Sequence, residues 1–353
     1  MSAGPSAPPT IVRHAGRWRE ELPGTPARWL LAPAWPPYRI AVALRNWAYD
    51  HGWATQQRLP VPVISLGNLT AGGTGKTPAA LAVVERLRRA GRTPAILSRG
   101  YRGVDGINEE ARLAGDTPVV CDPDRIAGGH RALADGADCL VLDDGFQHRR
   151  LARDLDIVLC DATRPWGDDA GGRGAVLPLG YLREGRRGLR RAGLLWITRA
   201  DLVSAQRLAD LRGELAAWGP VVEERAVGFA LAPLAAAGPS GTVPTLTAEA
   251  AARPVLLVSG IGNPGGFEAA AQRAGLTVLE SHRFPDHHHY TAEQAQTLLA
   301  RATACGAELV TTGKDAVKLS AFIHQGAVLA VRSELVDPAP LDQALARVLA
   351  ARR

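Results

Sequence analysis

Short apolar runs alternate with segments of helical periodicity along most of this chain. From Pro62 onward, PVISLGN, TPAILSRG, PVVCD, DCLVLDDG and LDIVLCDA are brief apolar runs, which are typical of buried strands. KTPAALAVVERLRRAG and PDRIAGGHRALADG space their apolar residues at helical intervals, and Gly91 ends the first of them. This β-α-β alternation predicts an α/β fold with a mostly parallel sheet covered by helices.

A second α/β series follows a segment with little periodicity. Residues 164–191 are rich in Gly, Arg and Pro, which indicates a long functional loop or a crossing between domains. Strands are then expected in GLLWITRADL, PVLLVSGIGNPGGF, TVLESHRF, AELVTTGKD and AVLAVRS, with helices between them. We therefore expect an N-terminal segment over 1–60, a first α/β domain over 61–163 and a smaller one over 164–335. A C-terminal helix over 336–353 can return to the first domain.

The N-terminal segment contains an apolar stretch rich in Trp, from Arg28 to Trp53. Pro33, Pro36 and Pro37 interrupt it, so it does not offer the roughly 20 consecutive apolar residues of a spanning helix. Arg and Trp beside Leu, Ile and Val favour a helix that lies in a membrane interface. A helix packed on its own domain is the alternative. The start, MSAGPSAPPT, does not have the pattern of a signal peptide.

Charge and composition limit the kinds of binding partner that the chain is expected to have. The 353 residues carry a formal net charge of +6, which suits an anionic partner or an Arg-rich proteome equally well. We expect no nucleic-acid partner, because no basic run is interleaved with aromatic residues. The four cysteines lack metal-ligand spacing and indicate a reducing compartment.

The stretch GNLTAGGTGKTP, from Gly67 to Pro78, carries the clearest chemistry. A Gly-rich loop between a strand and a helix turns backbone N–H groups into one concavity, so Gly72, Gly73, Thr74 and Gly75 are expected to cradle phosphates. In such a loop Lys76 reaches the outer phosphates and the Thr77 hydroxyl binds Mg²⁺. The strict pattern has Gly where this chain has Thr70. A turn that happens to contain Gly-Lys-Thr is the alternative.

A magnesium-binding carboxylate is expected at the end of a neighbouring strand. In CLVLDDGFQH, Asp143 and Asp144 follow four apolar residues and fit that role. Asp-Asp-Gly is also ordinary turn chemistry, but beside a P-loop we favour the magnesium interpretation. These residues do not distinguish a kinase from a GTPase switch or an ATP-driven motor.

Several motifs occurring in order carry a more specific resemblance. They are GNLTAGGTGKTP, LSRGYRG, LDDGFQHRRLARDLDIVLCDA, LPLGYLRE, GIGNP, FPDHHHYT and TTGKDAVKL. Together they resemble the tetraacyldisaccharide 4′-kinase family of lipid A biosynthesis, over about Val61 to Leu319. The resemblance implies transfer of the γ-phosphoryl group of ATP, with Mg²⁺, to the 4′-hydroxyl of tetraacyldisaccharide 1-phosphate. It also implies work at the cytoplasmic face of the inner membrane, which agrees with the interfacial segment and the basic charge.

The resemblance also implies roles for individual residues. Lys76 and Thr77 belong to the phosphate-binding loop, and Asp143 and Asp144 match the acidic pair near Mg²⁺. The residues expected to meet nucleotide, substrate or phosphate are Arg99, Tyr101, Arg125, Gln147 and Arg183. An Arg suits phosphate because its planar fork binds two oxygens at once.

The proposed base departs from the family pattern. The family has a catalytic Asp in a Gly-Asp-Glu-Pro segment, and this chain has INEEARLAG there. We align Glu109 with that Asp; Asn108 is the rival, and an Asn cannot accept a proton. His287, the first His of FPDHHHYT, is expected to act with this residue, with His288 and His289 as competitors.

A second departure is Gly313, where the family usually has Glu. Lys314 and Asp315 remain, either as an ion pair that closes a turn or in a direct role. A P-loop ATPase or GTPase that switches a protein partner is the alternative function, although TGKD lacks the Asn of the guanine-reading motif. A non-catalytic family member is a third interpretation.

Overall fold

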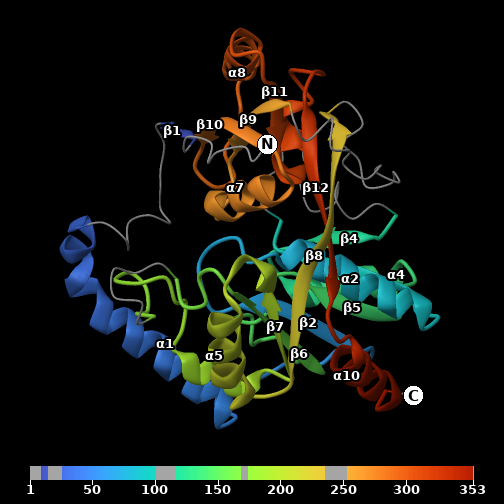
Figure 1. The fold of residues 1–353 in the computed structure, drawn as a ribbon. Helices are drawn as coiled ribbons and strands as arrows, with labels where there is room; N and C mark the ends of the chain where they lie inside the picture. Colours follow the sequence, from blue (N-terminus) through green and yellow to red (C-terminus); the bar gives the residue numbers. More distant parts are fainter. Residues whose placement is uncertain (1–8, 15–25, 101–115, 168–173, 235–252, 353) are drawn as a thin grey trace. The chain divides into compact units, whose positions relative to one another are not determined.

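The computed structural model describes residues 9–14, 26–100, 116–167, 174–234 and 253–352 (Figure 1). The chain divides into two compact units. The smaller comprises Met1–Arg19 and Ala226–Glu334, and the larger comprises Glu20–Arg225 and Leu335–Arg353. Two of the boundaries between the units fall within strands, one in β8 (Val221–Pro233) and one in β12 (Ala327–Leu335).

The larger unit is built on a parallel sheet with the strand order β8-β7-β6-β2-β5-β3-β4. Its strands are β2 (Val63–Asn68), β3 (Pro94–Ser98), β4 (Val119–Cys121), β5 (Cys139–Leu142), β6 (Leu155–Asp161), β7 (Leu194–Thr198) and β8 (Val221–Pro233). Every residue of β2, β3, β5 and β7 is buried, as expected for strands covered on both faces. This confirms the α/β fold and the parallel sheet that the alternation predicted.

Helices cover both faces of this sheet. On one face lie α2 (Lys76–Arg89) and α10 (Ala339–Ala350), whose Val83, Leu87, Leu341 and Leu345 pack on β2, β6 and β7 in one core cluster. On the other face lie α4 (Arg125–Ala134) and α5 (Ala205–Ala216), in two further clusters. The C-terminal helix therefore packs with the first series of strands.

The observed division differs from the boundary expected between residues 163 and 164. β7 pairs in parallel with β6 along its whole length, so the segment that contains it lies in the larger unit. The sequence pattern did not indicate this, because a strand after a long Gly-rich segment is compatible with either sheet.

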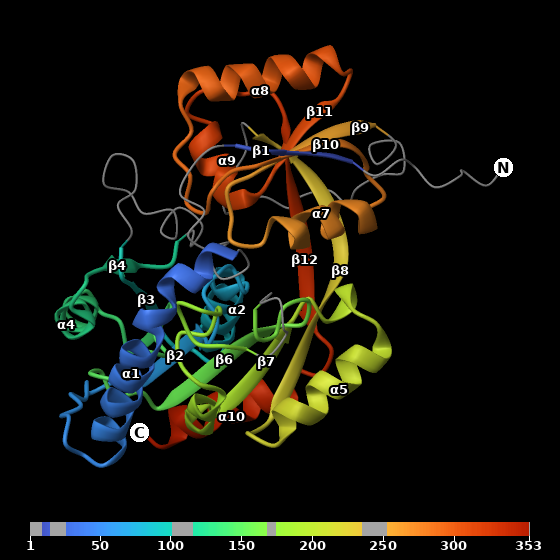
Figure 2. The ribbon, with the colours of Figure 1, turned by 90° about the vertical axis from the view of Figure 1, so that its left-hand side faces the viewer.

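The smaller unit is a second α/β layer structure. Its strand order is β1-β10-β9-β11-β12, and its described pairings are parallel. The strands are β1 (Thr10–Arg13), β9 (Pro254–Ser259), β10 (Thr277–Arg283), β11 (Glu308–Thr311) and β12 (Ala327–Leu335). Figure 2 shows α7 (Pro264–Arg273) on one side of these strands and α8 (Ala292–Ala304) and α9 (Gly313–Leu319) on the other.

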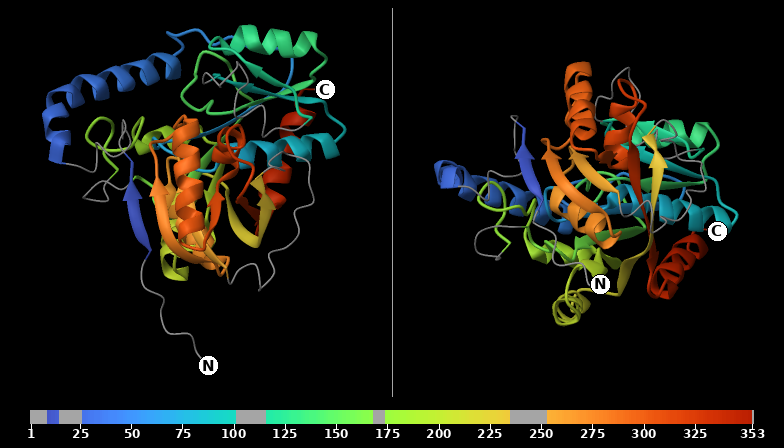
Figure 3. Two further views of the ribbon diagram at one scale, coloured as in Figure 1. Left: turned by 90° about the horizontal axis from the view of Figure 1, so that it is seen from above. Right: turned by 45° about the horizontal axis from the view of Figure 1, so that its top comes forward.

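The helix α1 (Trp35–Asp50) follows a 3-10 helix over Pro26–Ala34 in the larger unit (Figure 3). Pro36 and Pro37 stand in its first turn, where a missing N–H is tolerated. No residue of α1 is buried. Within the described part of the chain, no helix combines the length and apolar character needed to cross a bilayer.

Candidate functional site

The Gly-rich loop lies between β2 and α2, as its sequence predicted. Gly75 precedes α2 with φ 84°, and Gly72 has φ 121°, so both adopt a backbone conformation that favours glycine. The described non-glycine residues with positive φ are Asp144, Arg199 and His287. Thr70 is not among them, which explains why a residue with a side chain is accepted where the strict pattern has Gly.

Two cations hold one carboxylate beside this loop. Lys76 Nζ lies 3.6 Å from Asp144 Oδ1 and donates to Asn68 Oδ1 at 3.2 Å. Arg183 Nη1 donates to both oxygens of Asp144, at 2.9 and 2.8 Å. Burial raises the pKa of Asp144, but Lys76 and Arg183 outweigh it and bring the pKa to about 2. Asp144 is therefore ionised at neutral pH and orients both cations.

Thr77 and Asp143 form the second polar pair at the loop. The Thr77 hydroxyl lies 3.5 Å from Asp143 Oδ2, and Asp143 is buried directly after β5. A hydroxyl and a carboxylate are oxygen donors of the kind that Mg²⁺ takes together with phosphate oxygens and water. No group of three or more His, Cys, Asp or Glu side chains suitable for a metal occurs among the described residues. The hydroxyl of Thr77 and the carboxylate of Asp143 fit a Mg²⁺ whose remaining ligands come from nucleotide and water.

The end of β7 supports the loop from the other side, through two residues that the sequence motifs did not predict. The Thr198 hydroxyl donates to the Thr74 carbonyl at 3.1 Å, and Arg199 Nη1 donates to the Gly73 carbonyl at 3.3 Å. Arg199 also pairs with the buried carboxylate of Asp161, at the end of β6. Polar residues after the apolar run LLWI were the available signal, because carboxyl ends of parallel strands meet at one edge.

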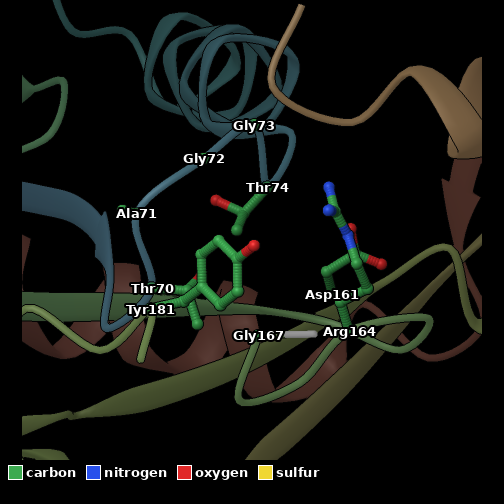
Figure 4. A pocket seen from close by; sticks show the side chains of 9 residues that line it. All are labelled: Thr70, Ala71, Gly72, Gly73, Thr74, Asp161, Arg164, Gly167 and Tyr181. Atoms are coloured by element: carbon green, nitrogen blue, oxygen red, sulfur yellow. The ribbon is translucent and has the colours of Figure 1, made fainter. Parts of the chain in front are cut away.

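A pocket adjoins the outer side of the loop (Figure 4). The loop residues Thr70 to Thr74 line one wall. The remaining lining residues are Asp161, Arg164, Gly167 and Tyr181. In Figure 4, Thr74 and Tyr181 lie on one side of this view, and Asp161 and Arg164 lie on the other. All of these residues belong to the larger unit.

The other substrate-binding candidates are placed differently. Gln147 lies beside Arg183, whose Nη1 donates to its Oε1 at 3.4 Å, and its Nε2 donates to the Asn68 carbonyl at 2.9 Å. Arg125 is buried at the start of α4, where its Nη1 donates to the Asp122 carbonyl at 2.8 Å. Tyr101, Asn108 and Glu109 lie outside the described residues.

His287 belongs to the smaller unit. It has φ 58°, its N–H donates to the Gly260 carbonyl at 3.1 Å, and its Nε2 lies 3.6 Å from Asp286 Oδ2. His288 is engaged differently, stacked on Phe284 with its Nε2 3.0 Å from Gln294 Oε1. The two histidines therefore have different partners, and the choice of His287 over His288 stays a prediction.

Asp315 is part of the framework of the smaller unit. It is fully buried and accepts from the Gly260 N–H at 3.0 Å, the Tyr290 hydroxyl at 3.2 Å and the Thr312 hydroxyl at 2.7 Å. Burial raises its pKa. These bonds fix the turn after β9 against α9, which is a structural role.

A Gly-Lys-Thr loop between a parallel strand and a helix, with a carboxylate at the end of the adjacent strand, defines a P-loop nucleotide-binding protein. A family profile described as Tetraacyldisaccharide-1-P 4'-kinase matches residues 27–350. The chain belongs to this family.

Individual proteins of this family are similar to the chain over most of its length. The chain is 42% identical over 351 residues to the Tetraacyldisaccharide 4'-kinase of Anaeromyxobacter dehalogenans (strain 2CP-1), covering 91% of this chain and 89% of that protein. It is 38% identical to the enzyme of that name from Geobacter sulfurreducens, covering 95% and 99%. Among solved structures it is similar to LpxK from Aquifex aeolicus in complex with ATP, with a TM-score of 0.68 and 27% identity, covering 92% of this chain and 99% of that one.

Proposed function

We propose that this chain transfers the γ-phosphoryl group of ATP to the 4′-hydroxyl of tetraacyldisaccharide 1-phosphate, a step of lipid A biosynthesis. The observation that carries the proposal is the pairing of Lys76 and Arg183 on one carboxylate, Asp144, beside the phosphate-binding loop. Lys76 and Arg183 bring two positive charges to the place where a polyphosphate would enter, and Asp144 fixes their positions. The family membership supplies the acceptor.

Charge neutralisation is the main work of the loop in this proposal. Lys76 binds the β- and γ-phosphates, and Arg183 meets the oxygens of the group in transfer. Thr77 and Asp143 hold Mg²⁺, which neutralises further phosphate charge when bound. Thr198 donates a hydrogen bond to the Thr74 carbonyl and Arg199 donates one to the Gly73 carbonyl. These bonds keep the N–H groups of the loop oriented. Pre-oriented donors of this kind lower the barrier without reorganisation during the step.

The proton of the sugar hydroxyl goes to Glu109 in this proposal, with His287 as its partner. A carboxylate within hydrogen-bond reach of the hydroxyl can accept its proton as the bond to phosphorus forms. Glu109→Gln is expected to lower kcat more than ATP affinity. If Asn108→Ala has that effect and Glu109→Gln does not, Asn108 holds the position of the family Asp.

The helix α1 is proposed to seat the enzyme on the cytoplasmic face of the inner membrane. Ile40, Leu44 and Trp47 are exposed at helical spacing on one face. Tyr38 and Asn46, on the other face, donate hydrogen bonds to the Arg183 carbonyl and to Glu184. An apolar face opposite a polar anchored face is typical of a helix in a lipid interface. The net charge of +6 favours an anionic leaflet.

The direct test is transfer of labelled γ-phosphate from ATP to tetraacyldisaccharide 1-phosphate in detergent micelles. The wild type is expected to give a labelled lipid, and Lys76→Ala to lose on the order of 10²-fold or more of the rate. ATP hydrolysis without labelled lipid contradicts the proposed acceptor and favours a nucleotide switch. Near-normal transfer by Lys76→Ala contradicts the assigned loop.

A further inference from the structure

A buried carboxylate, Glu184, lies between α1 and the phosphate-binding loop. Its side chain is 1% exposed and accepts from three partners. Arg191 Nη2 donates to Oε1 at 2.8 Å, Gln147 Nε2 donates to Oε1 at 3.2 Å, and Asn46 Nδ2 donates to Oε2 at 2.7 Å. A buried charge with this many partners is fixed in place, because each lost partner leaves it uncompensated.

On the loop side, Glu184 is two hydrogen bonds from the residue that holds Lys76. Gln147 Nε2 bonds both Glu184 and the Asn68 carbonyl, and Asn68 Oδ1 accepts from Lys76 Nζ. The preceding residue, Arg183, donates its N–H to the Leu69 carbonyl at 2.7 Å and its guanidinium to Asp144. Residues 183 and 184 are therefore linked both to Lys76, through Gln147 and Asn68, and to Asp144, through the Arg183 guanidinium.

On the helix side, Glu184 and Arg183 receive bonds from one face of α1. Asn46 donates to Glu184, and the Tyr38 hydroxyl donates to the Arg183 carbonyl at 3.0 Å. Farther along, Asp50 pairs with Arg149 Nη2 at 2.7 Å, and Tyr49 lies against the Arg149 guanidinium. Since α1 has no buried residue, these polar contacts rather than a packed apolar face orient it.

We propose that Glu184 is a positioning residue, through which α1 holds Gln147, Asn68 and Lys76 in the arrangement that binds and transfers phosphate. The inference rests on the proposed function, because one of its tests measures phosphate transfer to the lipid. Binding of α1 to a lipid surface then has two effects. It brings the enzyme to its substrate, and through these hydrogen bonds it helps to orient Lys76. Partners that orient an essential side chain commonly contribute one to two orders of magnitude in activity.

We call the chain of hydrogen bonds from α1 through Glu184, Gln147 and Asn68 to Lys76 the relay. Two variants on α1 test it without changing Lys76, Asp144 or Arg183. Asn46→Ala removes the bond to Glu184, and Tyr38→Phe removes only the hydroxyl that donates to Arg183. Each has a matched control. Tyr49→Phe makes the same change on the same helix, where the Tyr49 ring is what meets Arg149. Gln206→Ala truncates an amide that bonds Asp210 on the exposed side of α5.

Three quantities are measured for each full-length variant: kcat and KM for lipid transfer, Kd for ATP, and sedimentation with anionic phospholipid vesicles. We expect Asn46→Ala to lower kcat about tenfold and to weaken ATP binding several-fold, with vesicle binding and lipid KM unchanged. Tyr38→Phe is expected to follow with a smaller loss, and both controls to match the wild type.

Unchanged kcat and ATP affinity in both test variants overturn the relay, and so does a loss of kcat that follows a loss of vesicle binding. If Asn46→Ala does not fold, Tyr38→Phe decides, since it removes a single oxygen. If the wild type labels no lipid, the proposed function fails. The relay is then judged by ATP affinity: weaker binding in Asn46→Ala with intact vesicle binding supports it, and unchanged binding overturns it.

Discussion

The guanidinium of Arg183 and the carboxylate of Asp144 meet through a single nitrogen, Nη1, which donates to both carboxylate oxygens. Lys76 approaches the same carboxylate at 3.6 Å. Asp144 thus keeps two cations at one point, although they come from sequence positions more than a hundred residues apart. Its pKa of about 2 means that this arrangement persists throughout the neutral range.

Replacing Arg183 is expected to affect transfer more than folding. Arg183→Ala should lower kcat by on the order of 10²-fold, because one of the two cations beside the loop is lost. Arg183→Lys should restore only part of the rate, since an ammonium does not offer a planar fork to phosphate. Initial rates of labelled transfer at saturating ATP and lipid measure both effects.

The matched control is Arg190→Ala, an exposed arginine of the same segment. It removes the same charge away from Asp144 and should leave kcat near the wild-type value. Equal losses in the two alanine variants would show that general positive charge, and not the contact with Asp144, is what matters.

Gly67 is expected to be intolerant of any side chain. A Cβ at this position would lie 2.5 Å from Phe146 Cβ and 2.8 Å from the Phe146 backbone nitrogen. Phe146 is fully buried directly after Asp143, Asp144 and Gly145, so neither partner can move without shifting the acidic pair. Gly67→Ala should cost about 3 kcal/mol or more in the free energy of unfolding.

Denaturant unfolding followed by Trp fluorescence measures this cost. Gly213→Ala is the control, because Gly213 lies inside α5 with nothing within 4 Å of an added Cβ. That change should stabilise the chain by about 0.5–1 kcal/mol through helix propensity. An unchanged stability of Gly67→Ala would mean that the close approach of β2 to Phe146 is not present in solution.

What could be predicted from the sequence was the chemistry that is local in the chain. The loop from Gly72 to Thr77 is contiguous, and Asp143 and Asp144 are adjacent, so each motif could be read without knowing the fold. Their juxtaposition followed from a general property of parallel sheets, because β2 and β5 are neighbours and both end at the same edge. The alternation of strands and helices predicted the fold class for the same reason.

What could not be predicted depends on pairings between distant segments. Thr198 and Arg199 reach the loop only because β7 lies beside β6 and β6 beside β2. Glu184 gains its role from Asn46, which lies 138 positions earlier in the chain. β1 pairs with β10 from the opposite end of the sequence, and four residues carry no periodicity strong enough to predict that. The positions of Glu109 and Tyr101 stay predictions.

The exposed face of α1 is expected to govern lipid binding. Leu44→Gln together with Trp47→Ser should lower partition onto anionic vesicles by about tenfold, since each removes apolar area that the interface would cover. Vesicle sedimentation and lipid KM report this, while the ATP affinity should stay unchanged. Phe322→Ser, which removes an exposed aromatic ring elsewhere, is the control. Equal partition of the double variant and the wild type would contradict the membrane role of α1.

His148, which follows Gln147, is expected to make the stability of the protein fall on mild acidification. Burial, together with the nearby Arg125 and Arg153, lowers the pKa of His148 to about 4, although Asp124 opposes this shift in part. Above pH 6.5 the imidazole is neutral in both the folded and the unfolded chain. Between pH 6.5 and about 4 the unfolded chain takes up a proton that the folded chain does not, so folding free energy is lost as the pH falls through this window.

Unfolding free energies of the wild type and His148→Gln, measured at half-unit steps from pH 7.5 to 4.5, test this contribution. The wild type should lose up to about 1.4 kcal/mol more per pH unit below pH 6.5 than the variant does. Any difference between the two proteins at pH 7.5 reports packing and is subtracted. Parallel pH profiles would show that His148 is protonated in the folded protein as readily as in the unfolded chain, and that Arg125 and Arg153 do not act on it.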